Sequence, residues 1–230
     1  MDTFKETEDY FQFIRPYQEA MDFLMVQIKI LNEDYREKYR DYPIHNIQSR
    51  IKEKESIVEN WTDHCRTAGA CARKIAERCK DLDGDRAYAM GLLHDIGRRE
   101  GVMDMKHIIC GYRFMKAMGY VDIARICLTH SFPYKNIKSY NGKNDCSEEE
   151  TIFIKDFLEQ REYDDYDRLI QLCDAVSFPK GSTYIEKRLV DVVMRRGFND
   201  LTIPKWKAFF DLKAYFDEKA GEDIYKIIKV

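Results

Sequence analysis

The stretch Met90–Gly97 reads MGLLHDIG and sets a histidine beside an aspartate, His94 and Asp95, at the end of an apolar, small-residue segment. A neutral imidazole and a carboxylate are good ligands for divalent metal ions. Consecutive side chains leave a helix in different directions, so this pair alone cannot enclose an ion. A metal site at this position therefore needs further ligands from other parts of the chain.

Histidines recur on the apolar faces of the neighbouring segments. His64, His107 and His130 each share a face with apolar residues at the 3.6-residue spacing of an amphipathic helix. One such histidine alone is more often a core residue than a ligand. Asp174 lies on the apolar side of a helix predicted over residues 165–177. Burying an unpaired carboxylate costs several kcal/mol, so Asp174 needs a cation or a strong hydrogen-bond donor.

The candidate ligands form a set that spans five predicted helices and uses four of the chain's five histidines. The set comprises His64, His94, Asp95, His107, His130 and Asp174. Several buried imidazoles and two buried carboxylates within one helical domain require a shared partner. A divalent metal is the simplest partner that satisfies all of them.

Composition limits the classes of protein that the chain can represent. Its 230 residues, 44% of them hydrophobic, are enough for one compact domain with an appendage or for two small domains. The net charge of −3 gives no basic field, so we expect no binding to DNA or RNA duplexes. No apolar run approaches the ~18 residues of a membrane span and no signal peptide opens the chain. Seven cysteines without a CxxC motif predict reduced packing thiols and a cytoplasmic protein.

Few alternating apolar and polar runs occur, so the predicted fold class is all-α. A change of pattern near residues 57–60 predicts an N-terminal helical extension over residues 1–58 and a main domain over residues 59–230. The extension carries a heptad-like apolar seam over residues 7–38. Both a helix packed on its own domain and a homodimerisation arm fit this seam.

Local signals place the ends of several helices. The Asp81–Asp85 turn starts the helix predicted over residues 86–95, and Gly97 suits its C-terminal stop. Ser147 with Glu150 predicts a capping box, and a final helical pair is expected from about Thr202. Residues 131–143 are predicted to form a loop.

The order His64, His94-Asp95, Asp174, with LLHDIG at its centre, is similar to the signature of the HD-domain metal-dependent phosphohydrolases. The resemblance implies an all-α bundle with a metal at its centre, held by these four residues. His107 and His130 lie where the binuclear branches of the family place extra ligands. Those branches include the HD-GYP phosphodiesterases and the small bacterial dinucleoside-tetraphosphate hydrolases. Asp95 would then bridge to a second metal.

The resemblance also implies a reaction: hydrolysis of a phosphate ester or anhydride, in a small nucleotide-like substrate, by metal-activated water. The expected catalytic residues are Asp95, which would bridge the two metals, and Arg98, which resembles the family's phosphate-binding basic residue. A basic residue beside a helix C-terminus is also favourable for purely electrostatic reasons. Arg99 and Lys180 are weaker phosphate-binding candidates. Iron or manganese suits the mixed nitrogen and oxygen ligands, and zinc, magnesium, nickel and cobalt are compatible.

Two departures from the family narrow this expectation. The GYP element is missing, and Arg98-Arg99 stands where the alarmone hydrolases carry acidic residues, so both activities are disfavoured. Residues 13–59 resemble the opening helices of small alarmone synthetases, without that family's catalytic core. Two other functions remain open: a di-iron oxygenase of the same fold, and a regulatory module that binds nucleotide or metal without catalysis.

Overall fold

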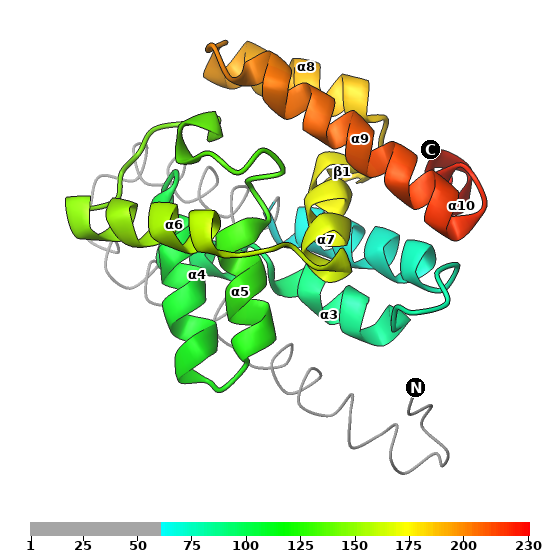
Figure 1. Cartoon of the computed structure of the whole chain (residues 1–230), viewed down its shortest axis with the longest axis horizontal. Helices are drawn as coiled ribbons and strands as arrows, with labels where there is room; N and C mark the ends of the chain where they lie inside the picture. Colours follow the sequence, from blue (N-terminus) through cyan, green and yellow to red (C-terminus); the bar gives the residue numbers. More distant parts are fainter. Residues whose placement is uncertain (1–60) are drawn as a thin grey trace, which may run out of the picture. The chain divides into compact units, whose positions relative to one another are not determined.

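The computed structural model of the protein describes residues 61–230, and within them the fold is built almost entirely from helices (Figure 1). Residues 61–76 are helical, followed by α3 (Gly84–Leu93), the 3-10 helix η1 (Ile96–Glu100), α4 (Lys106–Ala117) and α5 (Val121–Thr129). Next come η2 (Ile137–Ser139), α6 (Glu148–Gln160) and α7 (Asp165–Ala175). The chain ends with α8 (Ile185–Arg196), α9 (Thr202–Ala220) and α10 (Ile224–Ile228).

The all-α prediction is confirmed for this part of the chain. Its strands are the two-residue β1 (Ser177–Phe178) and β2 (Gly181–Ser182), paired antiparallel across a turn at residues 179–180. The seam over residues 7–38 and the segment that resembles alarmone synthetases lie outside the described residues. No helix among residues 61–230 is both long and apolar enough to cross a bilayer.

Side-chain caps explain where several helices begin. The Asp83 carboxylate accepts a hydrogen bond from the Arg86 amide and starts α3, as the turn predicted. Ser147 and Glu150 form the predicted capping box at the start of α6. The predicted final helical pair is also present, as α9 and α10.

The helix predicted over residues 86–95 ends earlier than expected. α3 stops at Leu93, His94 caps it, and Asp95 has already left helical geometry. Gly97 does not stop this helix, so that interpretation was wrong: it lies inside η1, against the backbone of α4. A Cβ at Gly97 would stand 1.9 Å from the carbonyl oxygen of His107. Glycine is required there because the two segments approach too closely for a side chain.

The core holds the histidine-bearing elements together. α4 packs on α5 and η1, α3 packs on α5 and α7, and α7 packs on α9 (Figure 1). Large side chains of these helices and of the helical segment 61–76 are fully buried, among them Ile75, Met90, Leu93, Ile108 and Ile126. All seven cysteines are free thiols, and all but Cys146 are buried, which agrees with the predicted packing role. The site described next lies where these elements meet.

Candidate metal centre

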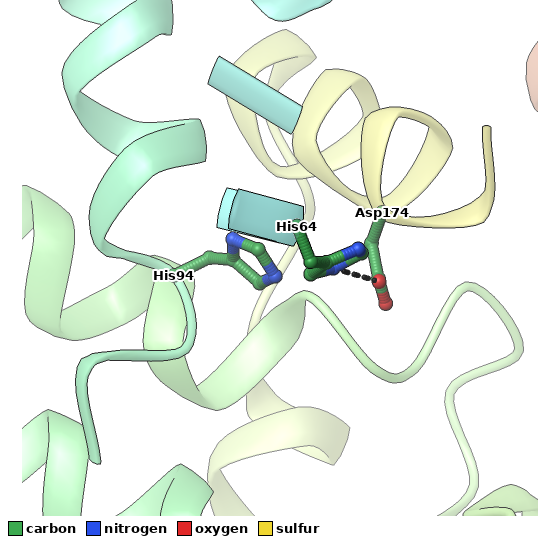
Figure 2. Close-up of side chains that lie close together, drawn as sticks. All are labelled: His64, His94 and Asp174. Atoms are coloured by element: carbon green, nitrogen blue, oxygen red, sulfur yellow. Dashed lines mark ion pairs between the residues drawn. The ribbon is translucent and has the colours of Figure 1, made fainter. Parts of the chain in front are cut away.

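The first cluster joins His64, His94 and Asp174 from three separate elements (Figure 2). His64 lies on the helical segment 61–76, His94 follows α3, and Asp174 is in the last turn of α7. The His64 Nε2 atom is 3.0 Å from Asp174 Oδ1, and the His64 and His94 ring centroids are 5.3 Å apart. One ligand atom from each residue falls within 4.8 Å of the others. The three residues could therefore hold one metal ion.

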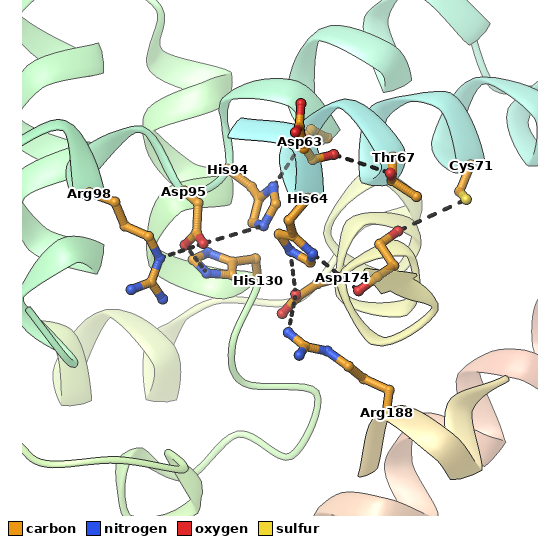
Figure 3. Close-up of polar contacts among 12 residues, drawn as sticks. Asp63, His64, Thr67, Cys71, His94, Asp95, Arg98, His130, Asp174 and Arg188 are labelled. Carbon is orange, nitrogen blue, oxygen red and sulfur yellow. Dashed lines mark hydrogen bonds and ion pairs between the residues drawn. The ribbon is translucent and has the colours of Figure 1, made fainter. Parts of the chain in front are cut away.

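The second cluster joins Asp95, His107 and His130, whose ligand atoms also lie within 4.8 Å of one another. Asp95 Oδ1 is 2.9 Å from His107 Nε2 and 3.4 Å from His130 Nε2. The two clusters are neighbours, because the His94 and His130 ring centroids are 4.9 Å apart. The structure thus brings all six predicted ligands together, three in each cluster. Figure 3 shows five of them: His64, His94, Asp95, His130 and Asp174.

Backbone carbonyl groups set the tautomer of all four histidines. In each ring, Nδ1 lies within hydrogen-bond distance of a carbonyl oxygen, which can only accept. The carbonyls belong to Ser177, Gly91, Asp104 and Cys127, for His64, His94, His107 and His130 respectively. With the proton on Nδ1, the lone pair on Nε2 faces the cluster. This arrangement orients imidazoles for metal binding.

Burial keeps two of these rings neutral. It lowers the pKa of His94 to about 4, against the attraction of Asp95. Burial, reinforced by the charge of Arg98, also lowers the pKa of His107. Burial opposes ionisation of Asp95, yet the charge and hydrogen bond of Arg98 hold its pKa well below the usual value. At neutral pH, an ionised carboxylate therefore faces imidazole lone pairs.

Such an arrangement is unfavourable without a cation. The His94 Nε2 and Asp95 Oδ1 atoms are buried and have no hydrogen-bond partner among the described residues. His107 Nε2 lies close to Asp95 Oδ1, but a neutral ring protonated at Nδ1 has no hydrogen to donate there. Unpaired buried lone pairs cost several kcal/mol, and a divalent ion would satisfy them all. The residues present therefore fit a bound divalent metal.

Arg98 lies beside the second cluster, as the sequence predicted. Its Nε donates to Asp95 Oδ2 at 2.6 Å, and its Nη1 donates to the Met103 carbonyl at 3.3 Å. Although burial disfavours its charge, Asp95 holds the pKa of Arg98 above the usual value. Arg99 instead stacks on the Phe114 ring, at 4.0 Å from the centroid, and Lys180 is exposed in the β1–β2 turn. Arg98 is thus the best placed of the three predicted phosphate-binding residues.

Asp174 is less enclosed than its apolar helix face predicts, since 23% of its side chain is exposed. Its carboxylate has the partners that its position on an apolar face requires, because His64 contacts it and Arg188 of α8 (Ile185–Arg196) lies 3.8 Å away. Burial raises its pKa, but the contact with His64 and the charge of Arg188 lower the pKa well below the usual value. Asp174 is therefore ionised and partly accessible from outside the cluster.

Four residues near the clusters were not identified from the sequence. Cys65 forms a candidate ligand group with His94 and Asp95, although burial raises the pKa of its thiol well above the usual value. The Tyr140 ring lies near the His107 ring, with 6.3 Å between centroids. Arg188 contacts Asp174, and buried Lys205 bonds to the loop that carries Tyr140. No local motif marks these positions, since only the tertiary fold brings them to the site.

Comparison with known proteins identifies the protein family to which the chain belongs. Neither the curated proteins nor the solved structures gave a match to the chain. The family model of the HD domain matches residues 61–178, slightly more than half of the chain and a segment that contains all six candidate ligands. The chain therefore belongs to the HD domain family.

Proposed function

We propose that the protein is a metal-dependent phosphohydrolase that acts on a phosphate ester or anhydride, in a nucleotide substrate. Membership of the HD domain family supports metal-dependent hydrolase activity in general. The observation that carries the proposal is the pair of adjacent clusters, in which neutral imidazoles direct Nε2 lone pairs at carboxylates.

Each cluster supplies the ligands for one ion in this proposal. His64, His94 and Asp174 hold the first, and Asp95, His107 and His130 hold the second. Asp95 also lies near His94, with 4.0 Å between His94 Nε2 and Asp95 Oδ2, so its carboxylate is placed to bridge the two positions. Bound divalent metals lower the pKa of a coordinated water towards neutrality and screen negative charge on phosphoryl oxygens.

The protein's own groups orient the reactants. The Nδ1 hydrogen bonds to backbone carbonyls hold the imidazole rings, so the rings need little rearrangement on binding. Arg98 is held at Nε by Asp95, and 28% of its side chain remains exposed. Its Nη1 donates to the Met103 carbonyl, which leaves Nη2 to bind a phosphoryl oxygen and to neutralise the charge that develops during attack.

The ligand types favour iron or manganese. Both ions accept mixed imidazole and carboxylate sets. Cys65 would add a soft sulfur ligand that favours zinc, but the other two members of its group, His94 and Asp95, already belong to the two clusters. We therefore expect the six nitrogen and oxygen ligands to decide the choice of metal.

The proposal is tested by a screen of phosphate esters, nucleotides and dinucleotides with protein loaded with manganese or with iron. Release of phosphate or of a nucleoside phosphate supports it. Metal-replete protein that releases nothing from the whole panel would contradict it. Oxygen uptake by the iron form would then indicate the oxygenase, and nucleotide binding without turnover would indicate the regulatory module.

The Asp95→Ala variant tests the bridging assignment. Metal per chain, measured by mass spectrometry, should fall by at least one ion, and turnover should fall with it. The control is Asp156→Ala, because Asp156 is exposed on α6 and outside both clusters. Full metal content and unchanged turnover in the Asp95→Ala variant would show that the bridging assignment is wrong.

A further inference from the structure

Arg188 brings a cation from α8 to the Asp174 end of the site (Figure 3). Its Nη2 is 3.8 Å from Asp174 Oδ1, and its Nη1 is 3.5 Å from Asp191 Oδ2. Its guanidinium carbon also lies 5.4 Å from the centre of the Phe178 ring. Both polar contacts are long for charge-assisted hydrogen bonds, which are usually about 2.7–2.9 Å. Several donors of Arg188 are therefore available for another partner.

Lys205 adds a second cation from α9. The residue is buried, with 7% exposed, and its Nζ donates to the Ser139 carbonyl at 3.1 Å and to Asn141 Oδ1 at 2.9 Å. Both acceptors are neutral, and Lys205 forms no ion pair with a carboxylate in the described part of the chain. A buried cation without an anion is costly. Burial accordingly lowers the pKa of Lys205 to about 8, and the charges that act on it are those of Asp174 and Arg188.

The charges at this end of the site do not balance once a metal is bound. Asp174 is the carboxylate that faces both Arg188 and His64. If it gives its charge to an ion, Lys205 loses the carboxylate charge that acts on it, and Arg188 keeps only Asp191, which it shares with Arg195. At the opposite end, Arg98 keeps its own contact with Asp95, so it does not neutralise this excess (Figure 3). The excess positive charge at the Asp174 end calls for an anion from outside the protein.

We propose that Arg188 and Lys205 form a subsite for a second phosphoryl group, next to the one that is hydrolysed. This inference rests on the proposed function. Arg188 lies within 3.8 Å of Asp174, a predicted metal ligand, so the second phosphoryl group would lie next to the one that is hydrolysed. Two adjacent phosphoryl groups imply a phosphoanhydride substrate, such as a nucleotide with a diphosphate linkage. The subsite belongs to α8 and α9, which lie beyond residues 61–178 and so outside the segment that the family model matches.

The experiment compares two anions that differ by one phosphoryl-like group. Inorganic phosphate and methylenediphosphonate, which is not hydrolysed, are titrated into manganese-loaded protein by calorimetry, each premixed with one equivalent of manganese. We expect wild-type protein to bind the diphosphonate at least about tenfold more tightly, since one good charge-assisted hydrogen bond accounts for such a factor. Arg188→Gln and Lys205→Gln should each remove most of this preference and leave phosphate affinity within about threefold.

Three further measurements separate a lost subsite from a damaged fold. Arg188→Lys should restore part of the preference, because it keeps the charge. Arg195→Gln, on the exposed side of the same helix, should behave like wild type. Circular dichroism and metal content should stay unchanged in every variant used. If Lys205→Gln does not fold, Arg188→Gln alone decides the result.

The outcomes distinguish this inference from the function on which it rests. Wild-type protein that binds phosphate without preferring the diphosphonate overturns the inference alone, as does a preference that survives in Arg188→Gln. Wild-type protein that binds neither anion and hydrolyses none of the screened phosphates overturns the proposed function, and the subsite with it.

Discussion

Gly97→Ala should separate two segments that must touch for the second cluster to form. A Cβ at this position would lie 1.9 Å from the His107 carbonyl oxygen, 2.8 Å from its carbonyl carbon and 2.6 Å from the Gly111 amide nitrogen. All three are backbone atoms of α4, so no side-chain rotation relieves the overlap. An ordinary contact begins near 3.4 Å, so η1 and α4 would have to move apart by more than an ångström.

The cost of this movement can be bounded from known core substitutions. Overpacking by one carbon costs about 1–3 kcal/mol, and the rigid neighbours of Gly97 place it at the upper end. For a domain of this size, each kcal/mol lowers Tm by roughly 2–4 °C, so we expect a decrease of roughly 6–12 °C. Because His107 lies in the displaced helix and Asp95 directly precedes η1, the second cluster should also lose its ion.

Thermal unfolding by circular dichroism and metal content by mass spectrometry measure both effects. The matched control is Gly84→Ala, where the new Cβ would meet Glu77 Cγ at 3.0 Å and Arg73 Cγ at 3.4 Å. Those atoms belong to flexible side chains and can move. Gly97→Ala with the Tm and metal content of the control would refute the close-approach argument.

Three further predictions address the site and the fold. Arg98→Gln should keep full metal content but lower kcat/KM for a phosphate substrate by about 10–100-fold, because a charge-assisted contact to the phosphoryl group is lost. If metal content falls in proportion to kcat/KM, Arg98 is instead a structural partner of Asp95. Metal-free protein should keep its full free energy of unfolding above pH 6.5, the ordinary pKa of histidine. This free energy should decrease by about 3 kcal/mol as the pH falls towards 4, because His94 takes up a proton in the unfolded chain but stays neutral in the folded one. Urea unfolding at pH 7.5 and pH 4.5 measures this loss, and equal midpoints would show that His94 is not buried in its neutral form. Ser147→Ala removes the cap that pairs with Glu150 and should lower the free energy of unfolding by about 1 kcal/mol without changing metal content, which urea unfolding and metal analysis check together.

The features that the sequence predicted well are local. A capping box needs only Ser147 and Glu150 three positions apart, and the structure contains both of its hydrogen bonds. The ligand positions follow from helical periodicity, because a histidine on an apolar face must point towards the core. His64, His107 and His130 are accordingly buried, and each reaches a cluster.

The features that it did not predict depend on contacts between distant segments. Arg188 and Lys205 lie on helices without a motif, and only the packing of α8 and α9 places them near Asp174. Gly97 was interpreted as a helix stop because glycine commonly follows a helix end. Its actual role is set by the backbone of α4 at His107 and Gly111, ten and fourteen residues along the chain, which no local pattern reveals.

The early end of α3 explains how one dipeptide can serve two clusters. If the helix continued through Asp95, the two side chains would diverge by about 100° from a common axis, and both would be tied to the face of α3. Instead, His94 caps the helix and donates Nδ1–H back to the Gly91 carbonyl at 2.6 Å, so its Nε2 faces His64 and Asp174. Asp95 begins the 3-10 turn and joins the cluster that lies against α4 and α5. The close approach at Gly97 holds that turn in place, so the same few residues that end the helix also divide the ligands between two positions.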